Sequence, residues 1–477
     1  MVKLLRHWNF DWAPSRTPMV SLLVCSGGQP VLHHPRLHLN DKLLMGAVML
    51  ERLFKLNQFG TTPKTEIMAG ITTYLTMAYI IFVNPAMLAD AGMDKGAVFM
   101  ATCLAAAAGC FIMGLWANLP VALAPGMGLN AFFTYGVVLG MGHSWQTALG
   151  AVFLSGIVFL LLSVFKIREA IINTIPTTLK LAIAAGIGAF LALIALKSSG
   201  IIVDHPATLV GLGDLTSLSP ALSLIGFFAI IAAVQRNIPG AVMIVVLGIT
   251  VIGLIIGDVE FAGIVSAPPS IAPTFMQMDL VAALDVAMLS VIFAFLFVDL
   301  FDTSGTLIAV TQRAGIAKDG QVPRLGRALV ADSTATIVGA GLGTSSTTSY
   351  IESASGVAAG GRTGLTAVTV GVLFVLSIFF APLAGMVPVY ATAGAILYVA
   401  VLMMFTLKEV EWSDLTEAAP VAVVLLLTPL TFSIAHGITL GFITYAAAKL
   451  LGGRAKEVSM SVWVLAALLL AKVVFIG

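Results

Sequence analysis

The chain has 477 residues, of which 59% are hydrophobic and only 10% are charged. Soluble domains carry about 25% charged residues, so this composition indicates an integral membrane protein and excludes a soluble domain. The formal net charge is +1, which argues against a protein that binds nucleic acid through a concentrated basic surface. The three cysteines have unrelated spacings and form no disulfide framework or zinc motif.

The first part of the chain differs from the rest. Residues 1–45 mix Pro, Arg, His and Trp without periodicity. Their longest apolar run is too short for the hydrophobic core of a signal peptide and lacks the usual cleavage context. We therefore expect a disordered N-terminal tail over 1–45.

Apolar runs long enough to span a bilayer follow this tail, since a transmembrane helix needs about 20 apolar residues. The sequence predicts an all-α polytopic membrane protein with about 14 transmembrane helices and one further apolar segment at the C-terminus. The runs lie near 66–88, 97–118, 121–140, 146–165, 176–197, 219–235, 239–257, 281–303, 326–342, 344–360, 363–384, 388–407, 417–434, 436–452 and 458–476.

Two of these runs are predicted to form broken helices. The run at 121–140 contains ALAPGMGLNAFF, and the run at 344–360 contains GTSSTTSYIESASG. Both are too rich in polar and small residues for a helix that faces lipid. Non-helical backbone at membrane depth persists only where protein or a water-filled cavity satisfies its polar groups, so both segments should lie in the interior.

Charges in the loops indicate the orientation of the chain. If the N-terminus is cytoplasmic, the exterior loops carry mainly acidic residues and the interior loops carry mainly basic ones, which is the positive-inside pattern. We therefore expect a multi-pass protein of the cytoplasmic membrane with its N-terminus inside. The interior residues are Lys166, Arg168, Arg236, Arg313, Lys318, Arg324, Arg327, Arg362, Lys408, Lys449, Arg454 and Lys456.

The chain also contains a weak internal repeat. FVNPAML at 82–88 aligns with FVDLFDT at 297–303, and the apolar segment from Thr147 aligns with the one from Thr363. An odd number of spans separates the two halves, so the repeats are inverted relative to each other. Inverted repeats with a pair of broken helices at matching positions are typical of transporters that bind substrate at the membrane midplane.

Two carboxylates end one of the apolar runs. Asp299 and Asp302 follow VIFAFLFV, with no lysine or arginine between them. A charged carboxylate in hydrocarbon costs at least about 2.5 kcal/mol, and the i to i+3 spacing places both acids on one helical face. This favours a shared cavity over a purely structural role in which each aspartate pins a neighbouring span.

Glu352 lies inside the second broken run, with no lysine or arginine within nine residues on either side. Its hydroxyl-rich neighbours include Thr347 and Ser349. A glutamate in such a segment is a candidate proton carrier or substrate acceptor, unless it is a satisfied structural residue.

The first broken run offers groups for a flat heterocycle. Asn130 and Phe133 follow the Pro125–Gly128 break. An amide and an aromatic ring beside freed backbone groups suit edge hydrogen bonds and ring stacking. Aromatic residues alone would indicate no more than packing.

Four motifs together resemble one family. They are FKLNQFGTTPKTEIMAGITTYLTMAYIIFVNP (54–85), APGMGLNAFF (124–133), LFVDLFDTSGTLIAVTQRAG (296–315) and GTSSTTSYIESASGVAAGGRTGLTA (343–367). The chain from about Leu53 to the C-terminus is similar to the AzgA-like purine permeases of the nucleobase:cation symporter family, also called nucleobase–ascorbate transporters.

The resemblance implies a 7+7 inverted repeat divided into core and gate domains, with a short extended stretch in each broken helix. The first repeat would be 53–257, with core spans 66–165 and gate spans 176–257. The second would be 281–452, with core spans 281–384 and gate spans 388–452, followed by the extra segment 458–476. Homodimers through the gate domain are also implied.

By motif position, the resemblance implies a substrate site that includes Asn130, Asp299, Asp302 and Glu352. It implies import of purine bases with protons, and therefore a transporter rather than an enzyme. No metal or organic cofactor is expected, and the proton is the coupling ion. The Glu352-Ser353-Ala354-Ser355-Gly356 stretch departs from the pattern of uracil, urate and xanthine carriers, which favours hypoxanthine, guanine or adenine.

These residues suggest a mechanism. A neutral purine would stack on Phe133, while Glu352 or Asp302 accepts its N–H groups and Asn130, with the hydroxyls of Thr347 and Ser349 nearby, completes the site. A proton on Glu352 or Asp299 would remove the penalty of moving a bare carboxylate through the closed state, which couples the two gradients.

Other protein classes fit less well. A membrane prenyltransferase uses paired aspartates to hold magnesium diphosphate, but a second acidic cluster with nearby basic residues is missing from the sequence. An anion transporter of the same architecture would need basic residues in its site. A xanthine or uracil carrier and a passive channel remain as further alternatives.

Overall fold

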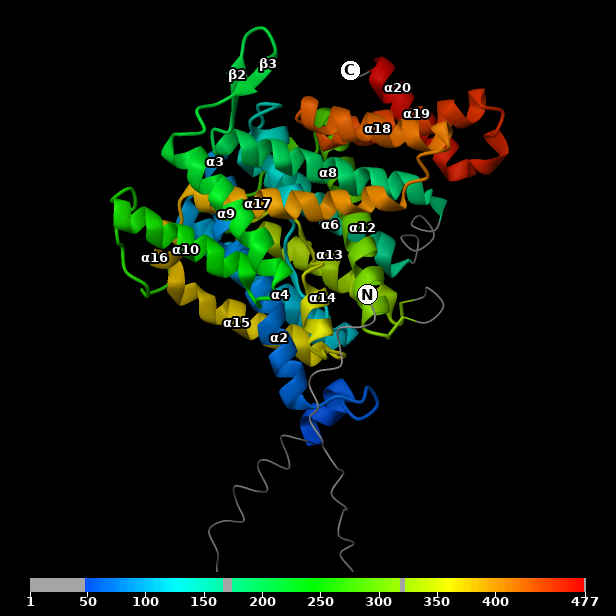
Figure 1. Ribbon diagram of the computed structural model, residues 1–477. Helices are drawn as coiled ribbons and strands as arrows, with labels where there is room; N and C mark the ends of the chain where they lie inside the picture. Colours follow the sequence, from blue (N-terminus) through cyan, green and yellow to red (C-terminus); the bar gives the residue numbers. More distant parts are fainter. Residues whose placement is uncertain (1–47, 166–173, 318–321, 476–477) are drawn as a thin grey trace, which may run out of the picture. The chain divides into compact units, whose positions relative to one another are not determined.

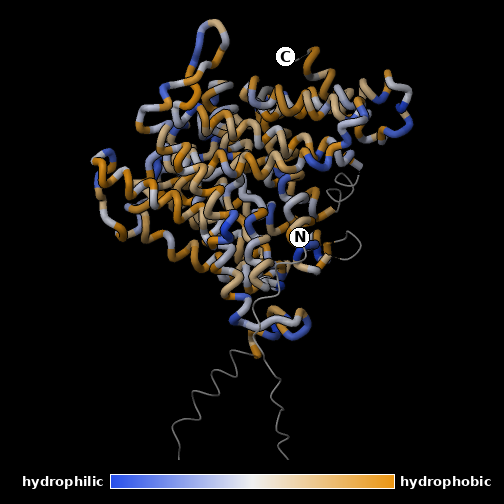
Figure 2. The backbone as a smooth tube through the Cα atoms, in the orientation of Figure 1, coloured by the Kyte–Doolittle hydropathy of each residue, from blue (hydrophilic) through white to orange (hydrophobic). Residues whose placement is uncertain are grey.

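The computed structural model describes residues 48–165, 174–317 and 322–475, and the features below lie within the unit Leu50–Gly477. The tail predicted at 1–45 lies outside the described residues. Helices make up most of this unit (Figure 1). In the described ranges, nine helices are long and apolar enough to cross a membrane, and several shorter apolar helices accompany them. Figure 2 shows hydrophobic residues along most of these helices.

The first half of the chain begins with two consecutive helices separated by a short irregular turn at 78–79. Its elements are α2 (Pro63–Met77), α3 (Ile80–Asp90), α4 (Lys95–Ile112), η1 (Met113–Ala117), β1 (Leu123–Pro125), α5 (Met127–Ala131), η2 (Phe132–Val138), α6 (Trp145–Val164), α8 (Thr177–Ser198), α9 (Leu218–Gln235) and α10 (Ala241–Ile256). A two-stranded hairpin, β2 (Ile202–His205) and β3 (Leu209–Leu212), connects α8 to α9.

The second half repeats this pattern of a long helix, an interrupted span and further helices. Its elements are α11 (Leu280–Ala283), α12 (Val286–Arg313), α13 (Leu325–Leu342), β4 (Thr347–Ser349), α14 (Ser353–Ala358), α15 (Gly364–Ser377), η3 (Ile378–Phe380), α16 (Ala381–Met386), α17 (Val389–Met404), η4 (Phe405–Glu409), α18 (Leu415–Leu430), α19 (Ile434–Leu451), η5 (Ala455–Glu457) and α20 (Met460–Phe475).

The helices form two sets by their packing. In one set α13 packs against α4 and α6, and α15 packs against α2 and α4. In the other set α8 lies between α17 and α18 and packs against both (Figure 1), and α18 also packs against α19. The predicted fold class, a helical polytopic membrane protein with two interrupted spans, is confirmed.

One helix extends beyond its predicted end. The run predicted at 281–303 continues as α12 to Arg313, and Gly305 is part of this helix. Two hydroxyls in this stretch bond back along the helix: that of Ser304 to the carbonyl of Leu300, and Thr311 Oγ1 to the carbonyl of Leu307 at 2.6 Å. A hydroxyl satisfied in this way suits a helix in apolar surroundings.

A buried carboxylate joins the start of α2 to the start of α15. Glu66 is fully buried. Its two carboxylate oxygens accept hydrogen bonds from the backbone N–H groups of Arg362 and Thr363, at 2.8 and 3.1 Å, and from the hydroxyl of Thr366 at 2.6 Å. The first N–H groups of a helix have no intrahelical acceptor, so Glu66 supplies acceptors at the N-terminus of α15.

Glu66→Ala should therefore destabilise the protein by about 3 kcal/mol, because several buried donors lose their acceptor at about 1–3 kcal/mol each. Thermal unfolding of the purified protein in detergent measures this effect. Glu260→Ala, at an exposed position, is the matched control and should leave the unfolding midpoint unchanged. An unfolding midpoint for Glu66→Ala equal to that of the control would contradict the capping role.

Candidate functional site

The two interrupted spans meet through their extended stretches. β1 and β4 pair antiparallel, with Ala124 opposite Thr348. The backbone N–H of Tyr350 donates to the carbonyl of Ala122 at 2.9 Å, and the Tyr350 hydroxyl donates to the carbonyl of Pro125 at 2.5 Å. These bonds satisfy backbone groups inside the membrane protein, as non-helical backbone at this depth requires. The start of α5 therefore lies beside β4, and the start of α14 lies beside β1.

Glycine is required at the turn from β1 into α5. A Cβ atom at Gly126 would lie 2.2 Å from Cγ2 of Thr348, and one at Gly128 would lie 2.4 Å from Cγ2 of Ile187 on α8. The absence of side chains at these two positions lets β1 approach β4 and lets α5 approach α8. The two helix sets therefore come close together beside the interrupted spans.

A small cavity of about 70 Å³ lies between the interrupted spans, α3, α12 and α17. Three polar side chains of the predicted site, Asp302, Ser349 and Glu352, line it. Glycines of the turn into α5 line it as well. The first backbone N–H groups of a helix have no intrahelical acceptor, so they can donate to acceptors of a ligand. The residues that line the cavity are Tyr79, Gly126, Met127, Gly128, Asp302, Thr306, Ser349, Tyr350, Ile351, Glu352, Val399 and Met403.

Both acids in this cavity have hydroxyl partners. The Tyr79 hydroxyl donates to Oε1 of Glu352 at 2.6 Å, and the Thr348 hydroxyl donates to Oδ2 of Asp302 at 3.3 Å. Tyr79 is almost fully buried, with 1% of its surface exposed. The donors are neutral, so each carboxylate keeps further acceptor capacity for a ligand.

Two larger cavities, of about 540 and 450 Å³, adjoin Glu352. Both are lined by Ile351 and Glu352, and the second also by Asp302. Arg313 lines the first and Lys180 the second. Because the predicted topology places both cations toward the cytoplasm, these cavities would connect the acid pair to that side.

The remaining predicted site residues lie behind the cavity wall. Asn130 and Phe133 are fully buried, and Oδ1 of Asn130 accepts a hydrogen bond from the hydroxyl of Ser345. The carbonyl of Thr347 accepts one from Thr336 at 2.9 Å. Asp299 is also buried, next to Thr303. None of these four predicted residues is among those that line the 70 Å³ cavity, so a direct contact between them and substrate stays a prediction.

Sequence reasoning missed Tyr79 as a site residue. It is separated from Glu352 by 273 positions, and in the sequence it is one aromatic residue in an apolar run. Its position at the turn between α2 and α3 brings its hydroxyl to the acid. Residue spacing within one segment cannot predict such a long-range contact. The two broken helices at matching positions of the repeats did, however, indicate the region that contains the cavity.

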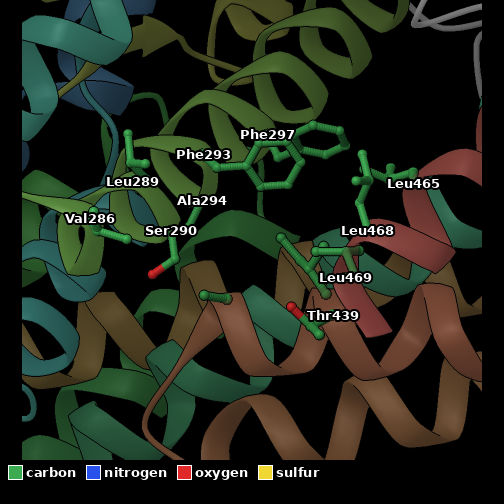
Figure 3. A pocket seen from close by; sticks show the side chains of 12 residues that line it. Val286, Leu289, Ser290, Phe293, Ala294, Phe297, Thr439, Leu465, Leu468 and Leu469 are labelled. Atoms are coloured by element: carbon green, nitrogen blue, oxygen red, sulfur yellow. The ribbon is translucent and has the colours of Figure 1, made fainter. Parts of the chain in front are cut away.

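A separate apolar cavity of about 470 Å³ lies between α12, α19 and α20 (Figure 3). Phe293 and Phe297 form one wall and Leu465 and Leu469 another, with Ser290 and Thr439 as polar members. Its lining carries no ionisable side chain. This chemistry does not suit a polar heterocycle, so the site is assigned to the smaller acidic cavity.

Comparison with known proteins agrees with this architecture. A family model described as "Permease family" matches residues 64–440. The chain is 51% identical over 440 residues to adenine permease AdeP of Escherichia coli K12, covering 92% of this chain and 99% of that protein. It is 49% identical over 428 residues to adenine permease AdeQ of the same organism, covering 90% and 96%. It is 46% identical over 421 residues to guanine/hypoxanthine permease PbuG of Bacillus subtilis 168, covering 86% and 96%.

Solved structures show the same fold at low sequence identity. The transmembrane domain of the cyanobacterial bicarbonate transporter BicA matches with a TM-score of 0.61 at 16% identity, covering 78% of this chain and 97% of that domain. SLC26A9 matches with a TM-score of 0.60 at 11% identity, covering 90% and 73%. The family is one of transport proteins, so the prediction of a transporter rather than an enzyme is confirmed. The chain belongs to the permease family, in the AzgA-like branch that its four motifs resemble.

Proposed function

We propose that this chain is a proton-coupled symporter that imports purine nucleobases across the cytoplasmic membrane by alternating access. The observation that carries the proposal is the cavity at the junction of the two interrupted spans, where Asp302 and Glu352 face one small space. Carboxylates accept hydrogen bonds only, and every free purine base carries at least one ring N–H. The permease relatives named for adenine and for guanine/hypoxanthine support the same substrate class.

The proposed site divides the recognition of a purine between acceptors and donors. Glu352 and Asp302 accept the N–H groups of the base. The N–H groups at the start of α5 and the Ser349 hydroxyl donate to its ring nitrogens or carbonyl oxygen. Asn130 and Phe133, as predicted from the sequence, would come into contact with the base only if the wall between them and the cavity moves during transport.

Among purines, we place adenine first. Relatives named as adenine permeases are 51% and 49% identical to this chain, whereas those named as guanine/hypoxanthine permeases are 46% and 42% identical. An anion as substrate is disfavoured, because two carboxylates line the cavity and like charges repel in a site of low dielectric. Xanthine and uracil are the remaining competitors of the same architecture.

Uptake competition tests this proposal. Cells that lack their own purine carriers and express this chain should take up labelled adenine. Unlabelled adenine, hypoxanthine and guanine should compete with the label, whereas uracil and xanthine should compete weakly. Competition by uracil or xanthine alone would contradict the purine assignment.

Tyr79 should position the carboxylate of Glu352. Tyr79→Phe keeps the ring and removes only the donor at 2.6 Å, and a hydrogen bond to a charged group contributes about 1.5–3 kcal/mol. We therefore expect the KM for purine uptake to rise by about tenfold, one decade per 1.4 kcal/mol, with unchanged amounts of protein in the membrane.

Tyr74→Phe is the matched control for this substitution. The Tyr74 hydroxyl bonds to Ser377 at 2.5 Å, away from the residues that line the acidic cavity. Its KM should equal that of the unsubstituted protein. Equal KM values for Tyr79→Phe and Tyr74→Phe would show that Tyr79 does not position Glu352.

The coupling proton is proposed to bind a carboxyl group of the same region, either Glu352 or Asp299. The N-terminus is proposed to lie in the cytoplasm, which the positive-inside pattern of the loops supports. A homodimer through the gate helices is proposed from the family resemblance, and the mass of the purified protein in detergent tests it. The proposed gate domain combines the spans of 176–257 and 388–452, and the proposed core domain combines those of 66–165 and 281–384.

A further inference from the structure

The small acidic cavity has two chemically different walls. The hydrogen-bonding side chains that line it belong to the turn before α3, to α12 and to the segment around β4. α3 packs against α4 and α12 packs against α6, so these elements belong to the first helix set. Of the described residues in the other set, Val399 and Met403 of α17 line the cavity, and both are apolar. A bound base would therefore be hydrogen-bonded by one helix set and face hydrocarbon of the other.

The two side chains of α17 occupy one helical face. Val399 and Met403 are four positions apart, so they lie one above the other on the helix. Val399 is 9% exposed and Met403 is half-buried. α17 lies close to α8 at Gly188, where an added Cβ atom would lie 2.8 Å from the carbonyl oxygen of Ala400 and 2.9 Å from Cβ of Met403. This close packing fixes the backbone from which both side chains reach the cavity.

Val399 and Met403 also separate this cavity from a larger neighbour. Both side chains line the 70 Å³ cavity and the 450 Å³ cavity, so they lie at the boundary between the two. Beyond them, the larger cavity extends along α8 past Ile183, Ala184 and Ile187, which are apolar. Shortening either side chain of α17 would therefore join the small cavity to a much larger apolar space.

We propose that Val399 and Met403 form a size filter that admits unsubstituted purine bases and excludes purines with an alkyl group on the edge that faces α17. This inference rests on the proposed function, and it names two residues that set the substrate specificity of the proposed site. Asp302 and Glu352 bind N–H groups of the base from the first helix set, so another edge of the base faces α17. A hydrocarbon wall distinguishes bases by size and shape, because dispersion contacts have no donor or acceptor to match.

The filter should respond to a single methyl group. One extra methylene in a hydrophobic pocket changes the specificity of a site by about 10–200-fold. A larger ligand in a closely packed site forces side chains or backbone to shift, and the contact with α8 at Gly188 restricts the movement of α17. The unsubstituted protein should therefore transport a purine methylated on this edge at least about tenfold less efficiently than adenine.

The experiment measures the exchange of adenine for methylated adenines. Purified protein and its Val399→Ala and Met403→Ala variants are reconstituted into liposomes that are loaded with labelled adenine. Unlabelled adenine, N6-methyladenine, 2-methyladenine or 8-methyladenine is then added outside. An external base speeds the efflux of the label only when the carrier brings that base in, so the initial rates give kcat/KM for each base relative to adenine.

Both alanine variants should raise the relative kcat/KM of at least one methylated adenine by at least about tenfold, because its methyl group then occupies the space of the removed side-chain atoms. The KM for adenine itself should rise by no more than about tenfold, since only van der Waals contact is lost and the hydrogen bonds to Asp302 and Glu352 stay. Val399→Phe adds volume to the same wall and should lower adenine exchange by at least about tenfold.

Val389→Ala and Met404→Ala are the matched controls. Both residues belong to α17, and neither lines the 70 Å³ cavity or the 450 Å³ cavity. Val389 is 51% exposed, and Met404 is the residue that follows Met403. Their relative kcat/KM values for the methylated adenines should equal those of the unsubstituted protein.

Each other outcome has a distinct meaning. Relative kcat/KM values in the two alanine variants equal to those of the controls would overturn the size filter. Loss of adenine exchange in both alanine variants, in protein that elutes as a single folded species, would overturn it in favour of a structural role. Where an alanine variant does not fold, Val399→Phe decides, because adenine exchange at the unsubstituted rate in that variant also overturns the filter. Absence of adenine exchange in the unsubstituted protein would instead contradict the proposed function itself.

Discussion

Replacing Glu352 by glutamine should reduce purine uptake by at least about 100-fold, because a charged acceptor that lines the cavity becomes an amide with one acceptor and two donors. Hydrogen bonds to charged groups contribute about 1.5–3 kcal/mol each, and two lost bonds of this kind to the purine correspond to two or more decades. Initial rates of labelled adenine uptake in cells measure the effect. Membrane fluorescence of a tagged protein shows that the variant is present.

The control for Glu352→Gln is Glu409→Gln. Glu409 lines the 450 Å³ cavity at its far end in η4, so it tests whether any carboxylate along the route is needed. Uptake by this control should change by less than about twofold, since a single exposed charge contributes little. If Glu352→Gln shows pH-dependent uptake at the rate of the unsubstituted protein, Glu352 does not belong to the substrate site.

Replacing Lys449 by methionine should cause the largest loss of stability. The Lys449 side chain is fully buried at the C-terminal end of α19, and Nζ lies 2.6 Å from Glu417 on α18 and 3.0 Å from Glu457. Removing one partner of a buried ion pair costs about 3–5 kcal/mol, because the other charge stays buried without compensation. Thermal unfolding in detergent should show a clear fall in the midpoint, with α18 and α19 exposed first to protease.

The neighbouring lysine provides the control for Lys449→Met. Lys456→Met removes a cation of the same type at an exposed position seven residues farther on and should leave the midpoint unchanged. A double substitution, Lys449→Met with Glu417→Leu, should recover most of the stability, because replacing both partners of a buried pair by apolar residues is often neutral. Equal midpoints for the two single variants would show that the buried pair does not stabilise the gate helices.

The same cluster gives a pH dependence with a defined sign. Hydrogen bonds from Thr416 and Arg454 hold the pKa of Asp414 well below its usual range, and Arg454 and Lys449 lower the pKa of Glu457. A carboxylate with a lowered pKa in the folded state stabilises the protein above its unfolded pKa, near pH 4. This contribution is lost as pH falls through the lowered folded values. The cluster is therefore fully formed at neutral pH and weakens only in strong acid.

The sequence was sufficient to locate several of the membrane helices along the chain. Long apolar runs, limited by the thickness of the bilayer, located α4, α6 and α8 within a few residues of their observed bounds. The two interrupted spans were also predictable, because Pro125 and the hydroxyl-rich stretch around Ser349 cannot form lipid-facing helix. Their antiparallel pairing was not predictable, because it depends on contacts between residues more than 200 positions apart.

The charge pattern was less reliable for single residues. The sequence predicts Lys449 to be one of the basic residues of the interior loops, but it is buried and paired with acids of α18 and η5. Hydropathy averages cannot distinguish a cation in the headgroup region from one neutralised by partners far away in sequence. The same limit hid the contact between Thr303 and Asp332, which are 29 positions apart in the sequence.

For the site, the sequence identified the acids but not which of them line the cavity. Asp302 and Glu352 line one cavity, whereas Asp299, about one turn earlier on α12, lies beside Thr303 and is not among the residues that line it. The i to i+3 spacing predicted one helical face for both aspartates. Because α12 lies between the cavity and α13, the two acids nevertheless have different neighbours.

Accumulation of labelled adenine in liposomes tests the central proposal most directly. With the protein as the only carrier and an inward gradient of one pH unit, we expect internal adenine about tenfold above the external concentration at one proton per purine. This accumulation should collapse when a protonophore removes the gradient, and it should be absent in Glu352→Gln. Equilibration of adenine without accumulation, or accumulation that ignores the protonophore, would contradict a proton-coupled purine carrier.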